Sequence, residues 1–157
     1  MGEVSQGKAV LVIDDSEDDT LLLRRAMDNC CPSVGVVQSV SNVEAAQRYL
    51  SGTGEYEDRS KYPMPRLIFL DLGLGRANGN AFLQWAKAHP RFRTIPIVAI
   101  TGHISERQAT ATLAQGASAV MVKGANFDEL KQGLLHATEL WLRHCIGPEL
   151  TPSGEAT

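Results

Sequence analysis

The chain has 157 residues, a length that fits one domain and leaves little room for a second. It is 43% hydrophobic and 21% charged, and no apolar run approaches the roughly 20 residues that a membrane span needs. The net charge is −3 with scattered lysines and arginines, which argues against nucleic acid as a partner. Residues 1–7 lack the features of a signal peptide, so we expect a cytoplasmic protein without membrane association.

Five short apolar runs predict five β-strands. Each run is too short for a helix, and continuous apolar runs of this length are typical of parallel strands buried on both faces. The predicted strands are Lys8–Ile13, Val34–Val40, Arg66–Leu70, Ile95–Ile100 and Ala119–Val122.

Helices are predicted between and after the strands. Four of them begin with a polar residue whose side chain can accept a hydrogen bond from a backbone N–H three residues later. These pairs are Ser16 with Asp19, Ser41 with Glu44, Ser105 with Gln108 and Asn126 with Glu129. A further helix is predicted from the apolar spacing of residues 81–86. Alternating strands and helices predict an α/β fold, a doubly wound five-stranded parallel sheet of flavodoxin-like order 2-1-3-4-5, with helices on both faces.

The domain is expected to span residues 8–146, with flexible termini at 1–7 and 147–157. The segment Ser51–Pro65 is the least regular part of the chain and is longer than a minimal connection, so it is either an idle loop or a contact surface. Cys30, Cys31 and Cys145 lack metal-ligand spacing, and we interpret them as packing thiols, with redox or intermolecular roles as the alternative.

Four of the predicted strands are followed by residues that can take part in chemistry. They are Asp14 and Asp15 after the first strand, Asp71 after the third, Thr101 after the fourth and Lys123 after the fifth. Each one alone would be an ordinary turn or cap residue, but the predicted strand order brings all of them to one edge of the sheet. Three carboxylates so close need compensation, which predicts a hard divalent cation such as Mg²⁺, with Mn²⁺ as an alternative.

A carboxylate held near Mg²⁺, with a lysine and a hydroxyl facing it, can form an aspartyl phosphate. In this hypothesis Asp71 is the nucleophile and phosphate acceptor, while Asp14 and Asp15 hold the metal. Lys123 neutralises one phosphoryl oxygen and Thr101 donates a hydrogen bond to another.

The chain resembles the receiver domain of two-component response regulators from Lys8 to about Cys145. The stretches VLVIDDSEDD, LIFLDLGLGRANG, IVAITG and AVMVKG look like the four signature stretches of that family. The resemblance implies a signalling protein, not an enzyme with a separate substrate, that catalyses its own phosphotransfer and dephosphorylation. It implies that a histidine kinase phosphorylates Asp71, that Asp14, Asp15 and the backbone carbonyl of Gly73 bind Mg²⁺, and that Thr101 and Lys123 contact the phosphoryl group.

The segment SGTGEYEDRSKYPMPRLIFLDL is similar to single-domain regulators that serve bacterial phytochromes. This narrower resemblance implies a bacteriophytochrome kinase as the partner and a homodimer formed through the C-terminal region. Whether a histidine phosphotransfer protein is a further partner is left open by the sequence. Leu135 and Leu142 lie off the apolar stripe of the last helix and fit such an interface, although a wide apolar helix face explains them equally.

Several positions depart from the family pattern. Gly124 replaces a common proline, which leaves the conformation of its loop open, and Gly75 replaces another proline. Val120 stands where receivers usually carry a tyrosine or phenylalanine, so coupling through an aromatic rotamer is expected to be absent. Gly73 and His103 occupy positions that can admit or exclude the hydrolytic water, and they are expected to tune the lifetime of the phosphoryl bond.

Two other functions compete with this hypothesis. One is an interaction module that keeps the receiver fold and has stopped using phosphate. The other is a haloacid-dehalogenase-like hydrolase, which normally carries a second aspartate two residues after the nucleophile. Gly73 stands at that place, which makes the hydrolase the weaker alternative.

Overall fold

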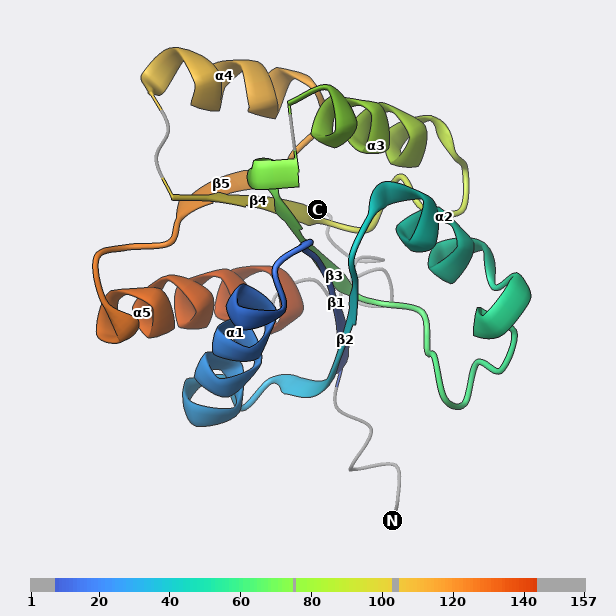
Figure 1. Ribbon diagram of the computed structural model, residues 1–157, viewed down its shortest axis with the longest axis horizontal. Helices are drawn as coiled ribbons and strands as arrows, with labels where there is room; N and C mark the ends of the chain where they lie inside the picture. The colour runs from blue at the N-terminus through green and yellow to red at the C-terminus, as the bar shows by residue number, and fades with distance from the viewer. Residues whose placement is uncertain (1–7, 75, 103–104, 144–157) are drawn as a thin grey trace, which may run out of the picture.

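The computed structural model describes residues 8–74, 76–102 and 105–143. Its centre is a five-stranded parallel sheet of order β2-β1-β3-β4-β5, which confirms the predicted topology (Figure 1). The strands are β1 (Lys8–Ile13), β2 (Val34–Val40), β3 (Leu67–Asp71), β4 (Ile97–Thr101) and β5 (Ala119–Val122). Asp71 and Thr101 are therefore the last residues of their strands, so the sheet itself fixes their backbones.

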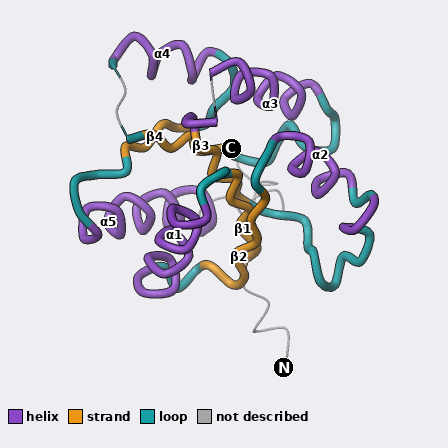
Figure 2. Tube along the Cα trace, viewed as in Figure 1, coloured by secondary structure: helices purple, strands orange, loops and turns teal. Residues whose placement is uncertain are grey.

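Five α-helices connect or follow the strands (Figure 2). They are α1 (Glu17–Cys30), α2 (Val43–Ser51), α3 (Arg76–Ala88), α4 (Glu106–Ala114) and α5 (Phe127–Thr138). Short turns of other helix types are η2 (Gly54–Tyr56), η3 (Leu72–Leu74) and η4 (Glu139–Arg143). No helix in the described ranges has the length and apolar character needed to span a membrane.

The sheet separates two hydrophobic cores. Helices α1 and α5 cover one face, and α2, α3 and α4 lie on the other (Figure 1). All residues of β3 are buried, and its side chains alternate between the cores. Leu67 and Phe69 pack with α1 and α5, while Ile68 and Leu70 pack with α2 and α3. Burial on both faces explains the continuous apolar run of the sequence.

Three of the four predicted helix starts are confirmed. Ser16, Ser105 and Asn126 are N-caps, and Ser105 with Gln108 forms a full capping box. The prediction for α2 was wrong by one residue. Asn42, not Ser41, accepts the hydrogen bond from the Ala45 N–H, at 2.7 Å. Asn42 has the extended backbone of an N-cap, and asparagine caps helices as well as serine does.

The end of α5 decides between the two interpretations of Leu142, in favour of a wide apolar helix face. The apolar stripe that includes Leu134 is buried as predicted, but Leu142 is also buried, at 1% exposure. It lies in η4 (Glu139–Arg143), a π-helical turn that shifts the helical phase and brings Leu142 into the core shared with α1. Leu135 and Leu140 remain exposed at 36% and 47%.

The adjacent cysteines are packing thiols within the protomer. Cys31 is buried, and burial raises the pKa of its thiol to about 12, so it stays protonated. Cys30 is half-buried. Cys145, Gly75, His103 and the predicted flexible termini 1–7 and 147–157 lie outside the described residues.

The segment Ser51–Pro65 packs against α2 of its own chain. Tyr49 of α2 lies beside Tyr56 and Tyr62, with ring centroids 5.1 and 5.9 Å away. The Arg59 guanidinium donates hydrogen bonds to the carbonyl of Leu50 at 2.8 Å and to that of Tyr62 at 3.0 Å. Arg59 thereby joins the end of α2 to the loop, and the tyrosine rings fill the space below it.

Arg59→Ala should lower the free energy of unfolding by about 1–3 kcal/mol, because two carbonyls lose a charged hydrogen-bond donor. Urea denaturation measures this change. Arg66→Ala is the matched control, because Arg66 is exposed, and it should stay within about 0.5 kcal/mol of the unmodified protein. Equal stability of the two variants would show that Arg59 does not anchor the loop.

Candidate functional site

Three carboxylates meet at the carboxyl end of the sheet. Asp14 directly follows β1, and Asp71 ends the neighbouring strand β3, where Ile13 and Leu70 are paired. Oxygen atoms of Asp14, Asp15 and Asp71 lie within 4.8 Å of one another. Asp14 and Asp71 are buried, at 3% and 8% exposure, while Asp15 is exposed. The structure thus brings together the predicted acidic residues.

The Asp14 carboxylate is in an unfavourable place for a negative charge. Burial, together with the neighbouring charge of Asp71, raises its pKa to about 6, although the Ser16 N–H bound to Oδ1 at 2.9 Å lowers it. Asp14 Oδ2 is buried and has no hydrogen-bond partner among the described residues. A buried carboxylate oxygen with no donor, beside two other carboxylates, fits a hard divalent cation.

The environment of Asp71 is shaped by the glycine that follows it. The Gly73 N–H, in the turn η3, donates a hydrogen bond to Asp71 Oδ1 at 3.0 Å. A Cβ atom at position 73 would lie only 3.1 Å from Asp71 Oδ2. Glycine therefore leaves one side of the Asp71 carboxylate uncovered, and any side chain at this position would crowd it.

Thr101 and Lys123 lie next to each other at the ends of β4 and β5. Val122 is paired with Thr101, and the Lys123 N–H donates to the Thr101 carbonyl at 2.8 Å. The Lys123 ammonium extends toward α1, where it donates to Asp19 Oδ2 at 2.7 Å. Burial alone would lower the pKa of Lys123, but the hydrogen bond to Asp19 and the charge of Asp71 raise it. The lysine is therefore fully charged.

Asp19 is the site residue that sequence reasoning missed. The sequence assigned it only to the helix start, as the partner of Ser16. Its N–H does bind Ser16 Oγ, at 3.2 Å, but its carboxylate contacts Lys123, which is 104 residues away in the chain. The acidic run around Asp19 is the only sequence signal, and it does not indicate which carboxylate meets the lysine.

One departure from the family pattern, Gly124, has a structural explanation. Gly124 has a φ of +90°, and a Cβ atom there would lie 2.7 Å from Glu129 Cβ. Neither proline nor another L-residue fits this conformation without strain. Glu129 uses the space to accept a hydrogen bond from the Ala125 N–H at 2.7 Å. Val120 is half-buried and packs against the core that contains α2 and α3.

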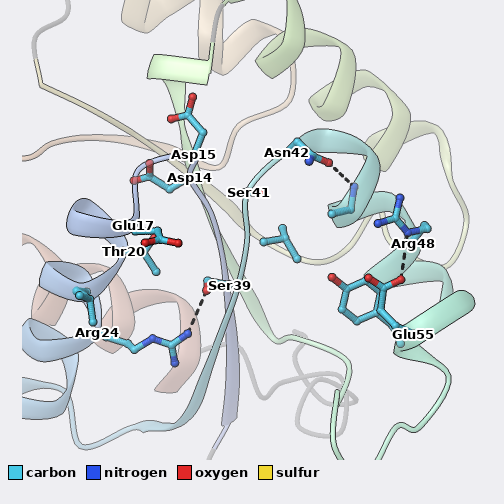
Figure 3. A pocket seen from close by; sticks show the side chains of 14 residues that line it. Asp14, Asp15, Glu17, Thr20, Arg24, Ser39, Ser41, Asn42, Arg48 and Glu55 are labelled. Atoms are coloured by element: carbon cyan, nitrogen blue, oxygen red, sulfur yellow. Dashed lines mark hydrogen bonds and ion pairs between the residues drawn. The ribbon is translucent and has the colours of Figure 1, made fainter.

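Asp14 and Asp15 line one end of a groove of about 580 Å³ between α1 and the start of α2. Figure 3 shows Asp14 and Asp15 at one end of the groove, with Ser41 and Asn42 beyond them. Further along, Arg24 reaches from α1 to Ser39 of β2, with a hydrogen bond of 3.0 Å. Asp71, Thr101 and Lys123 do not line this groove, so it extends from the Asp14 and Asp15 side of the site.

In metal-free protein, Asp14→Asn should be more stable than the unmodified chain at pH 8. The folded-state pKa of Asp14 is about 6, above the roughly 3.9 of an unfolded aspartate, so its contribution to stability is complete below pH 4 and is lost as the pH rises through 6. The advantage of the variant should be on the order of 1–3 kcal/mol at pH 8 and should shrink toward pH 4.5.

Urea denaturation in the presence of a chelator, repeated across this pH range, measures the difference. Asp15→Asn is the control for the loss of an acidic side chain at this edge of the sheet, because Asp15 is exposed. A variant that is less stable than the unmodified chain at pH 8 would contradict the assignment of a strained, buried carboxylate.

A family model for the response regulator receiver domain matches residues 10–135. The response regulator Rcp1 of Synechocystis sp. is 26% identical over 140 residues, which cover 89% of this chain and 92% of Rcp1. The structure of Rcp1 in its Mn²⁺-bound form matches with a TM-score of 0.72 over 87% of this chain and 96% of that one.

Two further solved structures have the same fold. The phosphorylated cyanobacterial phytochrome response regulator RcpA is 29% identical, with a TM-score of 0.74 over 87% of this chain and 94% of RcpA. RPA3017, a response regulator in red light signaling of R. palustris, has a TM-score of 0.78 at 24% identity, over 86% of this chain and 94% of that one. The chain belongs to the response regulator receiver domain family, and its relatives include phytochrome response regulators.

Proposed function

We propose that the chain is a cytoplasmic response regulator, with residues 8–146 as its receiver domain, that accepts a phosphoryl group on Asp71 from a phytochrome-type histidine kinase. One observation carries the proposal. Asp71 ends a strand buried on both faces, and its carboxylate lies with those of Asp14 and Asp15 within 4.8 Å at the edge of the sheet. The family to which the chain belongs gives this cluster its chemical context.

The cation in this proposal is Mg²⁺, with Mn²⁺ as a substitute. Asp14, Asp15, Asp71 and the backbone carbonyl of Gly73 would hold it, and the unpartnered Asp14 Oδ2 supports this ligand set. When bound, the cation neutralises the carboxylates and the charge that develops on the phosphoryl oxygens. The Mn²⁺-bound form of Rcp1 shows that a relative binds a divalent metal.

In the proposed phosphoryl transfer, each site residue has its own role. A carboxylate oxygen of Asp71 attacks phosphorus, the bond between phosphorus and the donor atom breaks, and the donor leaves with that electron pair. Lys123 and Thr101, joined through the Lys123 N–H, would bind the phosphoryl oxygens from the side of β4 and β5. Hydrolysis of the resulting acyl phosphate by the same site would return the protein to its starting state.

Incubation with Mg²⁺ and acetyl phosphate should add one phosphoryl group to the unmodified chain, as measured by intact-protein mass. Asp71→Asn should abolish the addition, because the amide is not a nucleophile, and a chelator should abolish it in the unmodified chain. Asp128→Asn, which changes an exposed carboxylate on α5, should be labelled normally. Labelling of Asp71→Asn would refute Asp71 as the acceptor.

The main alternative is a phosphorylation-independent interaction module. Two results together would favour that alternative. The unmodified chain would take no label, and Asp71→Ala would bind the partner with the same affinity as the unmodified chain. The presence of the complete acidic cluster, together with Lys123 and Thr101 at the same edge, favours the phosphoacceptor.

The kinase assignment predicts phosphotransfer from an autophosphorylated bacterial phytochrome kinase to Asp71. Its support is the likeness to Rcp1 and to the phytochrome response regulator RcpA. In a profiling experiment with labelled kinases, the phytochrome-type kinase should transfer its label at least about tenfold faster than kinases of other sensor types. Equal rates for all kinases would leave Asp71 as acceptor and reject the phytochrome pairing.

The proposal has two further parts. The chain forms a homodimer through its C-terminal region, and Asp71 can pass its phosphoryl group onward to a histidine phosphotransfer protein. Leu135 and Leu140 are exposed on the last helical segment and support an interface there. Leu142 does not support an interface, because it is buried in the core of its own protomer.

A further inference from the structure

We propose that Asp19 is a positioning residue that holds the Lys123 ammonium at the rim of the site and competes with the phosphoryl group for it. The inference rests on the proposed function, because it concerns what Lys123 does before and after Asp71 is modified. It adds a residue to the site, on α1, which neither the strand-end pattern nor the family resemblance assigned.

The position of Lys123 carries the argument. Its backbone N–H donates a hydrogen bond to the Thr101 carbonyl, which anchors the start of the loop after β5 beside β4. The ammonium is 2.7 Å from Asp19 Oδ2, while the charges of Asp71 and Asp14 also act on it. Within the described residues, the ion pair of Lys123 is with Asp19 and not with the acceptor Asp71.

The start of α1 makes the Asp19 carboxylate available. In a full capping box, the side chain at this third helical position would bind the N-cap N–H, as Gln108 does at Ser105. Here the Ser16 N–H is already bound by Asp14 Oδ1, at 2.9 Å. The Asp19 carboxylate therefore has no role in capping, whereas its backbone N–H is anchored by Ser16 Oγ. Ser16 therefore links two site residues: its N–H donates to Asp14, a proposed metal ligand, and its hydroxyl accepts from the N–H of Asp19, which contacts Lys123.

The contact is suited to exchange. The side chains of Lys123 and Asp19 are 26% and 41% exposed, so water competes for both and the pair can open at small cost. A phosphoryl group on Asp71 brings additional negative charge and strong acceptor oxygens. Lys123 then leaves Asp19 for the phosphoryl oxygens, and each modification of Asp71 also releases a contact between the β5–α5 loop and α1.

Removing the competitor should tighten phosphoryl binding. Beryllofluoride serves as the probe, since it occupies the place of the phosphoryl group on an aspartate, and its affinity is measured by titration in saturating Mg²⁺. Asp19→Asn should bind it about two- to fivefold more tightly than the unmodified chain, the range that a partly exposed ion pair contributes. The Asp19 N–H and its bond to Ser16 are kept in this variant, so α1 should begin normally.

Two matched variants separate the ion pair from general effects. Asp18→Asn removes the same charge from the same exposed helical turn, away from the lysine, and should bind beryllofluoride with nearly unchanged affinity. Asp19→Glu keeps a carboxylate near Lys123 and should restore the affinity of the unmodified chain. A structural role of Asp19 in helix capping would not give this order.

The outcomes distinguish the inference from the proposed function. If the unmodified chain binds no beryllofluoride and takes no label from acetyl phosphate, the proposed function fails and the competition fails with it. If the unmodified chain binds the probe and Asp19→Asn binds equally, more weakly, or no more tightly than Asp18→Asn, the competition alone is refuted.

Discussion

The burial of Asp14 against Asp71 is the constraint on which the site depends. Two neighbouring strands end in carboxylates that the sheet keeps from solvent, and folding alone cannot neutralise both. The raised pKa of Asp14 and its unpartnered oxygen are the physical signs of this unresolved charge. A site built in this way fits a divalent cation, because the positive charge would relieve the electrostatic strain that burial of these carboxylates introduces.

The fold could be predicted from the sequence because its signals are local. Short apolar runs such as Leu67–Leu70 are too brief for helices, and they are buried as predicted on both faces of the sheet. The errors arose where neighbouring residues are chemically equivalent or where helical geometry is irregular. Ser41 and Asn42 can both cap a helix, and only the backbone of Asn42 decided the choice. The π-helical turn that contains the buried Leu142 could not be predicted from the spacing of apolar residues along the sequence.

The candidate site was predictable up to the point where side chains choose partners. Strand-end positions follow from topology, so the gathering of Asp14, Asp15 and Asp71 could be foreseen. The partner of Lys123 could not be foreseen, because it depends on which donor at the start of α1 is already bound. Asp14 accepts the hydrogen bond of the Ser16 N–H, and the Asp19 carboxylate accepts that of Lys123. Long-range polar contacts of this kind are decided by competition among hydrogen bonds, and the order of residues along the chain does not encode that competition directly.

The two hydrophobic cores have a spectroscopic consequence. The sequence has two tryptophans, and each belongs to a different face of the sheet. Trp85 packs beside Phe82 and Phe92 in the core of α2 and α3, whereas Trp141 packs in the core of α1 and α5. The indole emission of the chain is therefore a sum of two independent signals. Variants that keep only one tryptophan would separate the two emission signals. Trp85 would report conformational changes on the face covered by α2 and α3, and Trp141 would report those on the face covered by α1 and α5.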